Sequence, residues 1–132
     1  MQRAAIDLVQ QEPTLAEAQA VHHEFKKKRD FLVQGLKEIG VKFDLEPQGT
    51  FYAWGNLSGL PRPIRNSDDF FKAALERQVI TVPGHFFDVN PGKRRTGRPS
   101  RFVQHMRFSF GPPMPVLEEA LERLGALVAE AK

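Results

Sequence analysis

The sequence contains no cysteine, and this absence removes several kinds of site at once. It excludes a disulfide scaffold, a thiolate metal centre and a cysteine nucleophile. No apolar run approaches the roughly 20 residues that cross a bilayer. The segment Met1–Asp7 also lacks the apolar core of a signal peptide. We therefore expect a cytoplasmic protein with no membrane partner.

Motifs of self-sufficient active sites are missing as well. The sequence has no GxxxxGK[ST] phosphate loop, no GxGxxG turn, no HExxH metal motif and no GxSxG nucleophile elbow. His22 and His23 are adjacent and would diverge on a helix, and four scattered histidines without cysteine do not predict a zinc site. We expect no metal site and no catalytic residue in this chain.

Acidic residues are absent between Asp88 and Glu118. The same interval holds six basic residues: Lys93, Arg94, Arg95, Arg98, Arg101 and Arg107. The rest of the sequence has 13 basic and 16 acidic residues, which gives a net charge of −3. The basic character of the chain is therefore local. Lys93 to Arg101 could contact phosphates. Only Phe102 accompanies them and no nucleic-acid-binding motif does, so we favour a solvated or interface loop over a nucleic-acid partner.

The residues that are present fit one globular domain. The chain has 132 residues, 41% of them hydrophobic and 27% charged, with 11 phenylalanines for a core. After Pro13, a capping box at residues 14–17 predicts a long helix that ends near Gly40. Its stripe, at alternating spacings of three and four, would be Leu15, Ala18, His22, Phe25, Arg29, Leu32, Leu36 and Ile39.

Two further helices are predicted. Ser67 is expected to cap the first, whose inner face would carry Phe71, Ala74, Leu75 and Gln78. The second runs from about residue 114 to residue 130. Its buried stripe would be Leu117, Ala120, Leu121, Leu124, Val128 and Ala131.

Strands are predicted at residues 41–43, 50–56, 79–82 and 102–110. The last one alternates, with Phe102, Gln104, Met106, Phe108 and Phe110 on one face and Val103, His105, Arg107 and Ser109 on the other. The better-defined elements follow the order helix, strand, helix, strand, strand, helix. This order predicts an α+β (two-layer α/β) fold, with helices packed on a small mixed β-sheet.

Three places could carry chemistry. Arg107 lies mid-strand, where its planar fork would suit a carboxylate, or it is simply an exposed arginine on the wet face of the sheet. Gly49 would allow the next strand to approach a ligand, although an ordinary turn would look the same. Gly84 and His85 follow a strand end, and His85 is either a polar site residue or a surface histidine.

Four fragments in order resemble a known family. They are Lys28-Arg29-Asp30 with Leu32 and Gly40, then Pro47-x-Gly49-x-Phe51-Tyr52, then Val82-Pro83-Gly84 before Phe86 or Phe87, then Arg107-Phe108-Ser109-Phe110. This order resembles the C-terminal small domain of class I/II aminotransferases, the pyridoxal-phosphate-dependent enzymes of aspartate aminotransferase fold type I. In this comparison residues 1–13 resemble a remnant of the inter-domain helix or linker, and residues 14–132 the small domain.

The resemblance implies a role for each matching residue. Arg107 would hold the α-carboxylate of the substrate. The turn and strand from Gly49 to Tyr52, which include Phe51, would lie near the mouth of the active site, and Pro83, Gly84 and His85 near the substrate side chain. The implied substrates are an amino acid and a 2-oxo acid. The implied partners are the large domain of the same enzyme and, for the full-length enzyme, a second subunit in a homodimer.

The resemblance also places the cofactor elsewhere. The family sets the lysine that carries pyridoxal phosphate in a Ser/Thr-rich turn of the large domain, and none of the lysines here lies in such a turn. The resemblance thus implies no cofactor-binding residue in this chain and no activity for the fragment alone. A pyridoxal-phosphate-dependent lyase or synthase of the same fold would keep Arg107. A stand-alone module that binds carboxylates or a protein is a further alternative.

Overall fold

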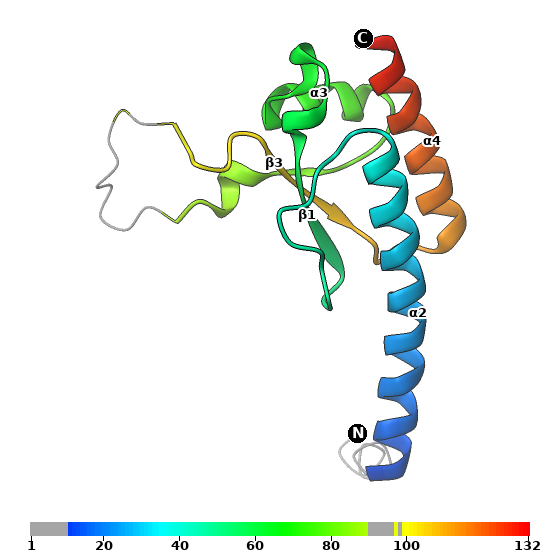
Figure 1. Cartoon of the computed structure of the whole chain (residues 1–132). Coiled ribbons are helices and arrows are strands. Elements are labelled where there is room, and N and C mark those ends of the chain that lie inside the picture. Colours follow the sequence, from blue (N-terminus) through cyan, green and yellow to red (C-terminus); the bar gives the residue numbers. More distant parts are fainter. Residues whose placement is uncertain (1–10, 90–96, 98) are drawn as a thin grey trace.

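The computed structural model describes residues 11–89, 97 and 99–132 (Figure 1). Its elements are α2 (Gln11–Glu38), β1 (Tyr52–Asn56), α3 (Ser67–Glu76), β2 (Val82–Pro83), β3 (His105–Ser109) and α4 (Met114–Glu130). Short 3-10 helices lie at η2 (Leu57–Gly59), η3 (Arg62–Ile64) and η4 (Gly84–Phe87). The order of helices and strands is the one that the sequence predicts.

The three strands form one sheet in the order β1-β3-β2, and both neighbours of β3 are antiparallel to it. The predicted two-layer α+β arrangement is confirmed, but the expectation that the sheet would be mixed is wrong for the described strands. The physical reason lies in the strand order. β1 and β2 run in the same direction, yet β3 separates them, so they form no parallel pair.

The core lies between the sheet and the helices. Figure 1 shows α2 and α4 together on one side of the sheet, and the other side carries none of the labelled helices. Met106 and Phe108 of β3 face the helices and are 0% and 4% exposed. Leu36 of α2 and Leu124 of α4 are buried in the same cluster. The predicted alternation is therefore confirmed for Met106, Phe108 and Phe110, whereas Phe102 and Gln104 precede β3 and are only partly buried.

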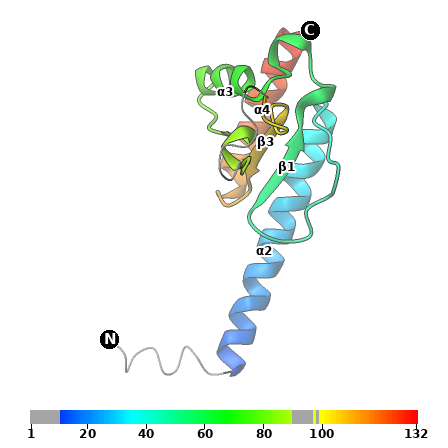
Figure 2. The ribbon, with the colours of Figure 1, turned by 90° about the vertical axis from the view of Figure 1, so that its left-hand side faces the viewer.

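The predicted stripe of α2 is buried only in its C-terminal half. Leu32 and Leu36 are 4% and 0% exposed, whereas Leu15 is 51% exposed. Figure 2 shows the N-terminal half of α2 extending beyond the rest of the domain. The helix also includes Pro13, which we expected to precede it. Proline is accommodated in a first helical turn because the backbone N–H groups there have no intrahelical partner.

The N-cap of α3 lies one residue earlier in the chain than we predicted. The N-cap is Asn66, whose side-chain oxygen accepts a 2.8 Å hydrogen bond from the backbone N–H of Asp68. Ser67 is instead the first helical residue, and it is buried together with Phe70 and Ala74. Leu75, predicted for the inner face, is 48% exposed. The buried face thus follows the spacing i, i+3, i+7 from residue 67.

All four predicted strands are shorter than expected, and the one predicted at residues 102–110 is β3, His105–Ser109. Residues 79–81 precede β2 without joining it, because the backbone N–H of Val79 bonds to the carbonyl of Ala74 after Gln78 turns the chain with φ 60°. Residues 41–43 make a single bridge, Lys42 with Asn56. The strand predicted from residue 50 begins at Tyr52.

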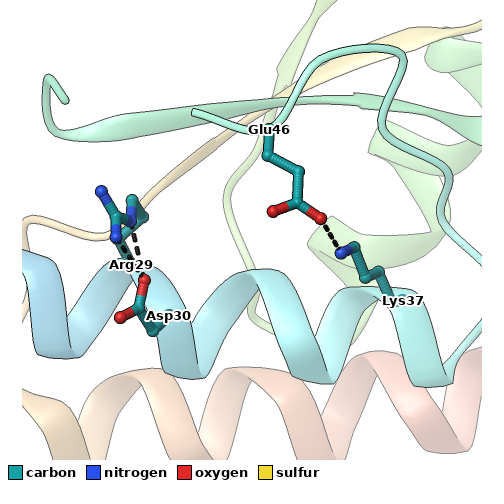
Figure 3. A network of polar contacts seen from close by, with 4 residues as sticks. All are labelled: Arg29, Asp30, Lys37 and Glu46. Carbon is teal, nitrogen blue, oxygen red and sulfur yellow. Dashed lines mark hydrogen bonds and ion pairs between the residues drawn. The ribbon is translucent and has the colours of Figure 1, made fainter. Parts of the chain in front are cut away.

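The segment that leads into β1 is anchored to α2. Glu46 forms an ion pair with Lys37 of α2, and Figure 3 shows the two side chains meeting between the segment and the helix. Earlier in α2, the side chain of Arg29 donates two hydrogen bonds to the carboxylate of Asp30, at 2.8 and 2.6 Å. The Lys37–Glu46 ion pair thus ties the chain that approaches Phe51 and Tyr52 to the helix.

Candidate functional site

Arg107 occupies the centre of the sheet, on the face opposite to the helices. Its Cα pairs with Trp54 of β1 on one side and with Val82 of β2 on the other. Its chain neighbours Met106 and Phe108 enter the core, so the pleat directs Arg107 away from it. The side chain is half-buried. Strand pairing on both sides thus fixes the position of this arginine within the domain.

Three aromatic rings surround the guanidinium of Arg107. Its Cζ atom lies 4.2 Å from the ring centre of Tyr52, 5.3 Å from that of Phe51 and 5.4 Å from that of Phe87. Each distance is within the limit of about 6 Å for a cation–π interaction. Phe51 and Tyr52 belong to the β1 side of the sheet, and Phe87 belongs to η4, which follows β2. We call Phe51, Tyr52 and Phe87 the aromatic collar.

Arg107 differs from the other half-buried arginines of the described residues. Arg29 donates to Asp30, Arg65 to the carbonyl of Leu60, Arg77 to Glu130 and Arg123 to Glu119. The Arg107 guanidinium has no oxygen partner within the described part of the chain, and its contacts there are rings. A guanidinium carries five N–H donors in a planar fork that matches a carboxylate. These donors are therefore available to an acid from outside the described residues.

The turn before Phe51 holds an unusual backbone conformation. Thr50 has φ 66°, in the left-handed region that β-branched residues avoid. Its Oγ1 atom accepts hydrogen bonds from the backbone N–H groups of Phe51 and, at 3.2 Å, of Tyr52. Gly49, which the sequence suggested for the bend, has no positive φ, and a Cβ atom there would meet nothing within 4 Å. The bend that leads into the collar is thus made by Thr50.

Gly84 permits a close backbone approach. A Cβ atom at this position would lie 2.6 Å from the carbonyl oxygen of His105 and 2.8 Å from that of Phe102. Only glycine fits there without a shift of the backbone. Gly84 thereby places η4, and with it Phe87, against the start of β3. Its predicted location near the substrate side chain stays a prediction.

His85 is held toward α3. Its Nδ1 atom lies 3.3 Å from Oδ1 of Asp68, and its ring packs against Phe86 with the ring centres 4.3 Å apart. The predicted site residues therefore divide into two groups. Arg107 and Phe51 are in contact, whereas His85 contacts Phe86 and Asp68 of the first turn of α3. A role for His85 near a substrate stays a prediction.

Sequence reasoning did not identify every residue at this face. Phe87 belongs to the collar, and Trp54 packs against it with ring centres 5.7 Å apart. His105 stacks on Trp54 at 5.7 Å, and its Nε2 atom lies 3.3 Å from Oδ2 of Asp44. Trp54 lies two residues after Tyr52 in the same strand, and this spacing was a signal for it. Nothing in the sequence distinguished Phe87 from Phe86.

Most of the predicted basic loop lies outside the described residues, namely Lys93, Arg94, Arg95 and Arg98. Arg101 is described, and its backbone N–H donates to Asp88 at 3.2 Å. The described ranges contain no group of three or more His, Cys, Asp or Glu side chains that could hold a metal ion. Within the same ranges, no helix combines the length and the apolar character that a membrane span requires.

Comparison with known proteins identifies the family. The family model "Aminotransferase class I and II" matches residues 1–124. This chain belongs to the class I and II aminotransferase family. An aspartate aminotransferase from Thermotoga maritima is 36% identical over 102 residues, which are 76% of this chain and 22% of that protein. The aminotransferase chain spans about a quarter of the length of the curated relatives that it matches.

Solved structures of aminotransferases share the fold. An aminotransferase from Mycobacterium tuberculosis superposes with a TM-score of 0.74 at 29% identity, over 96% of this chain and 30% of that one. The aspartate aminotransferase from Thermus thermophilus with maleate gives a TM-score of 0.72 at 26% identity, over 91% of this chain and 27% of that one. The family and the fold that the ordered fragments indicated are both confirmed.

Proposed function

We propose that this chain is the C-terminal small domain of a pyridoxal-phosphate-dependent aminotransferase, and that it binds the carboxylate of the substrate. The complete enzyme would transfer an amino group between an amino acid and a 2-oxo acid. The observation that carries the proposal is the guanidinium of Arg107, which is half-buried, enclosed by rings and without an oxygen partner in the described residues.

Bidentate binding of a carboxylate by Arg107 would do more than add affinity. Two parallel N–H···O bonds fix the plane and the direction of the bound acid. The amino or keto group next to that carboxylate then takes a defined position relative to the domain. Holding reactants in the correct geometry lowers a reaction barrier, and this arginine would contribute a part of that effect. Both substrates carry a carboxylate, so one arginine serves both halves of the reaction.

The residues around Arg107 do not form a site for the cofactor. Within the described residues this arginine contacts three aromatic rings, and no lysine amine is among its contacts. That donor set fits a carboxylate and offers no amine to a pyridoxal aldehyde. We infer that the rest of the enzyme binds pyridoxal phosphate, which supplies the electron sink of the family's chemistry. The chain alone would then be inactive.

The partners of this domain follow from the same proposal. The large domain of the enzyme would face Arg107 and close on the bound substrate, so that water is excluded from the site. The full-length enzyme would form a homodimer, as the family generally does. The matched relatives are named as aspartate aminotransferases, which makes aspartate the first amino acid to assay.

The test compares two arginine variants of the complete enzyme. We expect Arg107→Ala to lower kcat/KM for amino acid and 2-oxo acid by about ten- to a hundredfold, because charge-assisted hydrogen bonds contribute about 1.5–3 kcal/mol. Cofactor absorbance should not change. Arg62→Ala, at an exposed position of η3, is the matched control and should retain full activity. Unchanged kinetics in Arg107→Ala would contradict the proposal.

A further inference from the structure

The aromatic collar addresses a difficulty that any carboxylate-binding arginine faces. An arginine side chain has many rotamers, and an acid within its own chain could bind the guanidinium before a substrate arrives. Rings avoid the second problem, because a ring face attracts a cation without strong hydrogen bonds to the in-plane N–H donors. The guanidinium can thus be held in place while its donors remain available.

We propose that Phe51, Tyr52 and Phe87 are positioning residues that hold the Arg107 guanidinium ready for a carboxylate, with Tyr52 making the main contribution. This inference rests on the proposed function. Tyr52 is the closest ring, at 4.2 Å, and the strand register explains why. Trp54 pairs with Arg107 and Tyr52 pairs with Ser109, so Tyr52 is the diagonal neighbour of Arg107 on the same face.

Each ring of the collar is supported by another aromatic contact. Phe51 meets Tyr52 edge to face, with ring centres 5.4 Å apart and an interplanar angle of 85°. Phe87 meets Trp54 in the same manner, at 5.7 Å and 81°. Such pairs restrict the rings beyond what the burial of area alone provides. The rings on the two flanks of β3 therefore limit the movement of Arg107 from both sides.

Two unusual backbone positions hold the rings of the collar beside Arg107. Thr50 adopts a left-handed conformation immediately before Phe51, and Gly84 begins the turn that carries Phe87 at a place where no side chain would fit. Unfavourable backbone conformations persist where the surrounding structure enforces them, and they cluster at binding sites. The two features lie on opposite flanks of β3, and each delivers a ring to Arg107.

Kinetics of the complete enzyme test the contribution of each ring. We expect Tyr52→Leu to raise KM for both substrates about fivefold with little change in kcat, because the lost contact serves binding. Tyr52→Phe keeps the ring and should restore the original KM. Phe87→Leu should act in the same direction and provides a second variant if Tyr52→Leu fails to fold. Phe86→Leu removes the neighbouring ring, which packs on His85, and is the matched control.

Chemical rescue separates positioning from a general structural effect. Arg107→Ala leaves the rings without their cation, so millimolar guanidinium chloride should recover part of the lost kcat/KM. The same salt should not rescue the double variant Arg107→Ala/Tyr52→Leu, in which the main ring is also missing. Equal rescue of both variants, or no rescue of Arg107→Ala, would overturn the collar as a site for the cation.

The carboxylate site and the collar can be disproved separately. If Arg107→Ala retains full kcat/KM, the proposed carboxylate site is wrong. If Arg107→Ala loses activity but Tyr52→Leu and Phe87→Leu keep the original KM, the carboxylate site stands and the collar is wrong. Thermal unfolding and cofactor absorbance of every variant identify those in which the fold itself is lost.

Discussion

The guanidinium of Arg107 lies 4.2 Å from the ring of Tyr52, although the two residues are far apart in the sequence. Their contact exists only because β1 pairs with β3 in one register, which places Tyr52 diagonally across from Arg107. The candidate binding site and the sheet are therefore a single structure. Substitutions that change the sheet or its flanking turns should affect both stability and binding.

Gly84 is expected to tolerate no side chain. Gly84→Ala would bring a Cβ atom within 2.6 Å of a backbone oxygen, so η4 has to move away from β3. We expect a loss of about 1–3 kcal/mol in the free energy of unfolding, the usual result of overpacking. Urea unfolding measures it. Gly49→Ala is the matched control, because its Cβ would meet nothing within 4 Å. An equal loss in both variants would contradict the prediction.

Alanine substitutions at the two adjacent residues that begin α3 should have opposite effects on stability. Asn66→Ala removes the side chain that accepts from the Asp68 N–H and should lower the free energy of unfolding by about 1 kcal/mol. The Ser67 hydroxyl is buried and has no hydrogen-bond partner in the described structure. Ser67→Ala should therefore be neutral or stabilising, because an unsatisfied buried group is removed. Thermal melts of both variants decide, and a destabilised Ser67→Ala would indicate that Ser67 is the cap.

Thr50 offers a way to relieve backbone strain. Asparagine adopts the left-handed conformation more readily than a β-branched residue, and its side chain can still accept from the backbone N–H two residues on. We expect Thr50→Asn to raise the free energy of unfolding by about 0.5–1 kcal/mol. The midpoint of urea unfolding is the measurement. A lower midpoint would show that the threonine methyl group makes a contribution larger than the strain.

The ion pair between α3 and α4 predicts a pH dependence. The hydrogen bond from Arg77, and then its positive charge, hold the pKa of Glu130 below its ordinary value. A carboxyl with a lowered folded-state pKa stabilises the fold above its unfolded pKa, about 4.3, and this contribution disappears as the pH falls through the folded-state pKa. Glu130→Gln should therefore be less stable than the original chain at neutral pH.

The difference between these two chains should vanish in acid below both pKa values. It should also shrink with added salt at neutral pH, because the Glu130 carboxylate is exposed to solvent. Urea midpoints measured across the acid range provide the test. A stability difference that stays constant from neutral pH into acid would assign the effect of Glu130→Gln to packing instead of charge.

Local patterns in the sequence predicted much of this fold. The alternation around Arg107 predicted which residues of β3 enter the core, and the apolar period predicted α4 with its observed bounds. α3 was misjudged because adjacent Asn66 and Ser67 are both good caps, and a shift of one residue rotates the whole buried face. The long stripe of α2 predicted a helix correctly but did not reveal that Leu15 stays exposed.

The aromatic collar could not be predicted from local sequence patterns. Tyr52 meets Arg107 through the register of two distant strands, and register is set by the packing of the whole sheet. Phe87 arrives from a 3-10 helix with no periodic signal, next to an equally plausible Phe86. Thr50 carries no such signal, because its residue type argues against the left-handed conformation that it adopts. Departures from local preference of this kind are expected at functional sites.

The alternation of β3 has a consequence for how this segment can vary. Met106 and Phe108 serve the interior while Arg107 between them serves the opposite surface, so each side chain depends on the parity of its position. Insertion or deletion of one residue before Arg107 would exchange the two sets, sending a cation inward and apolar groups outward. Variation in this segment should therefore proceed by replacement of residues at constant length. A change of length would disrupt the packing of the core and the placement of Arg107 at the same time.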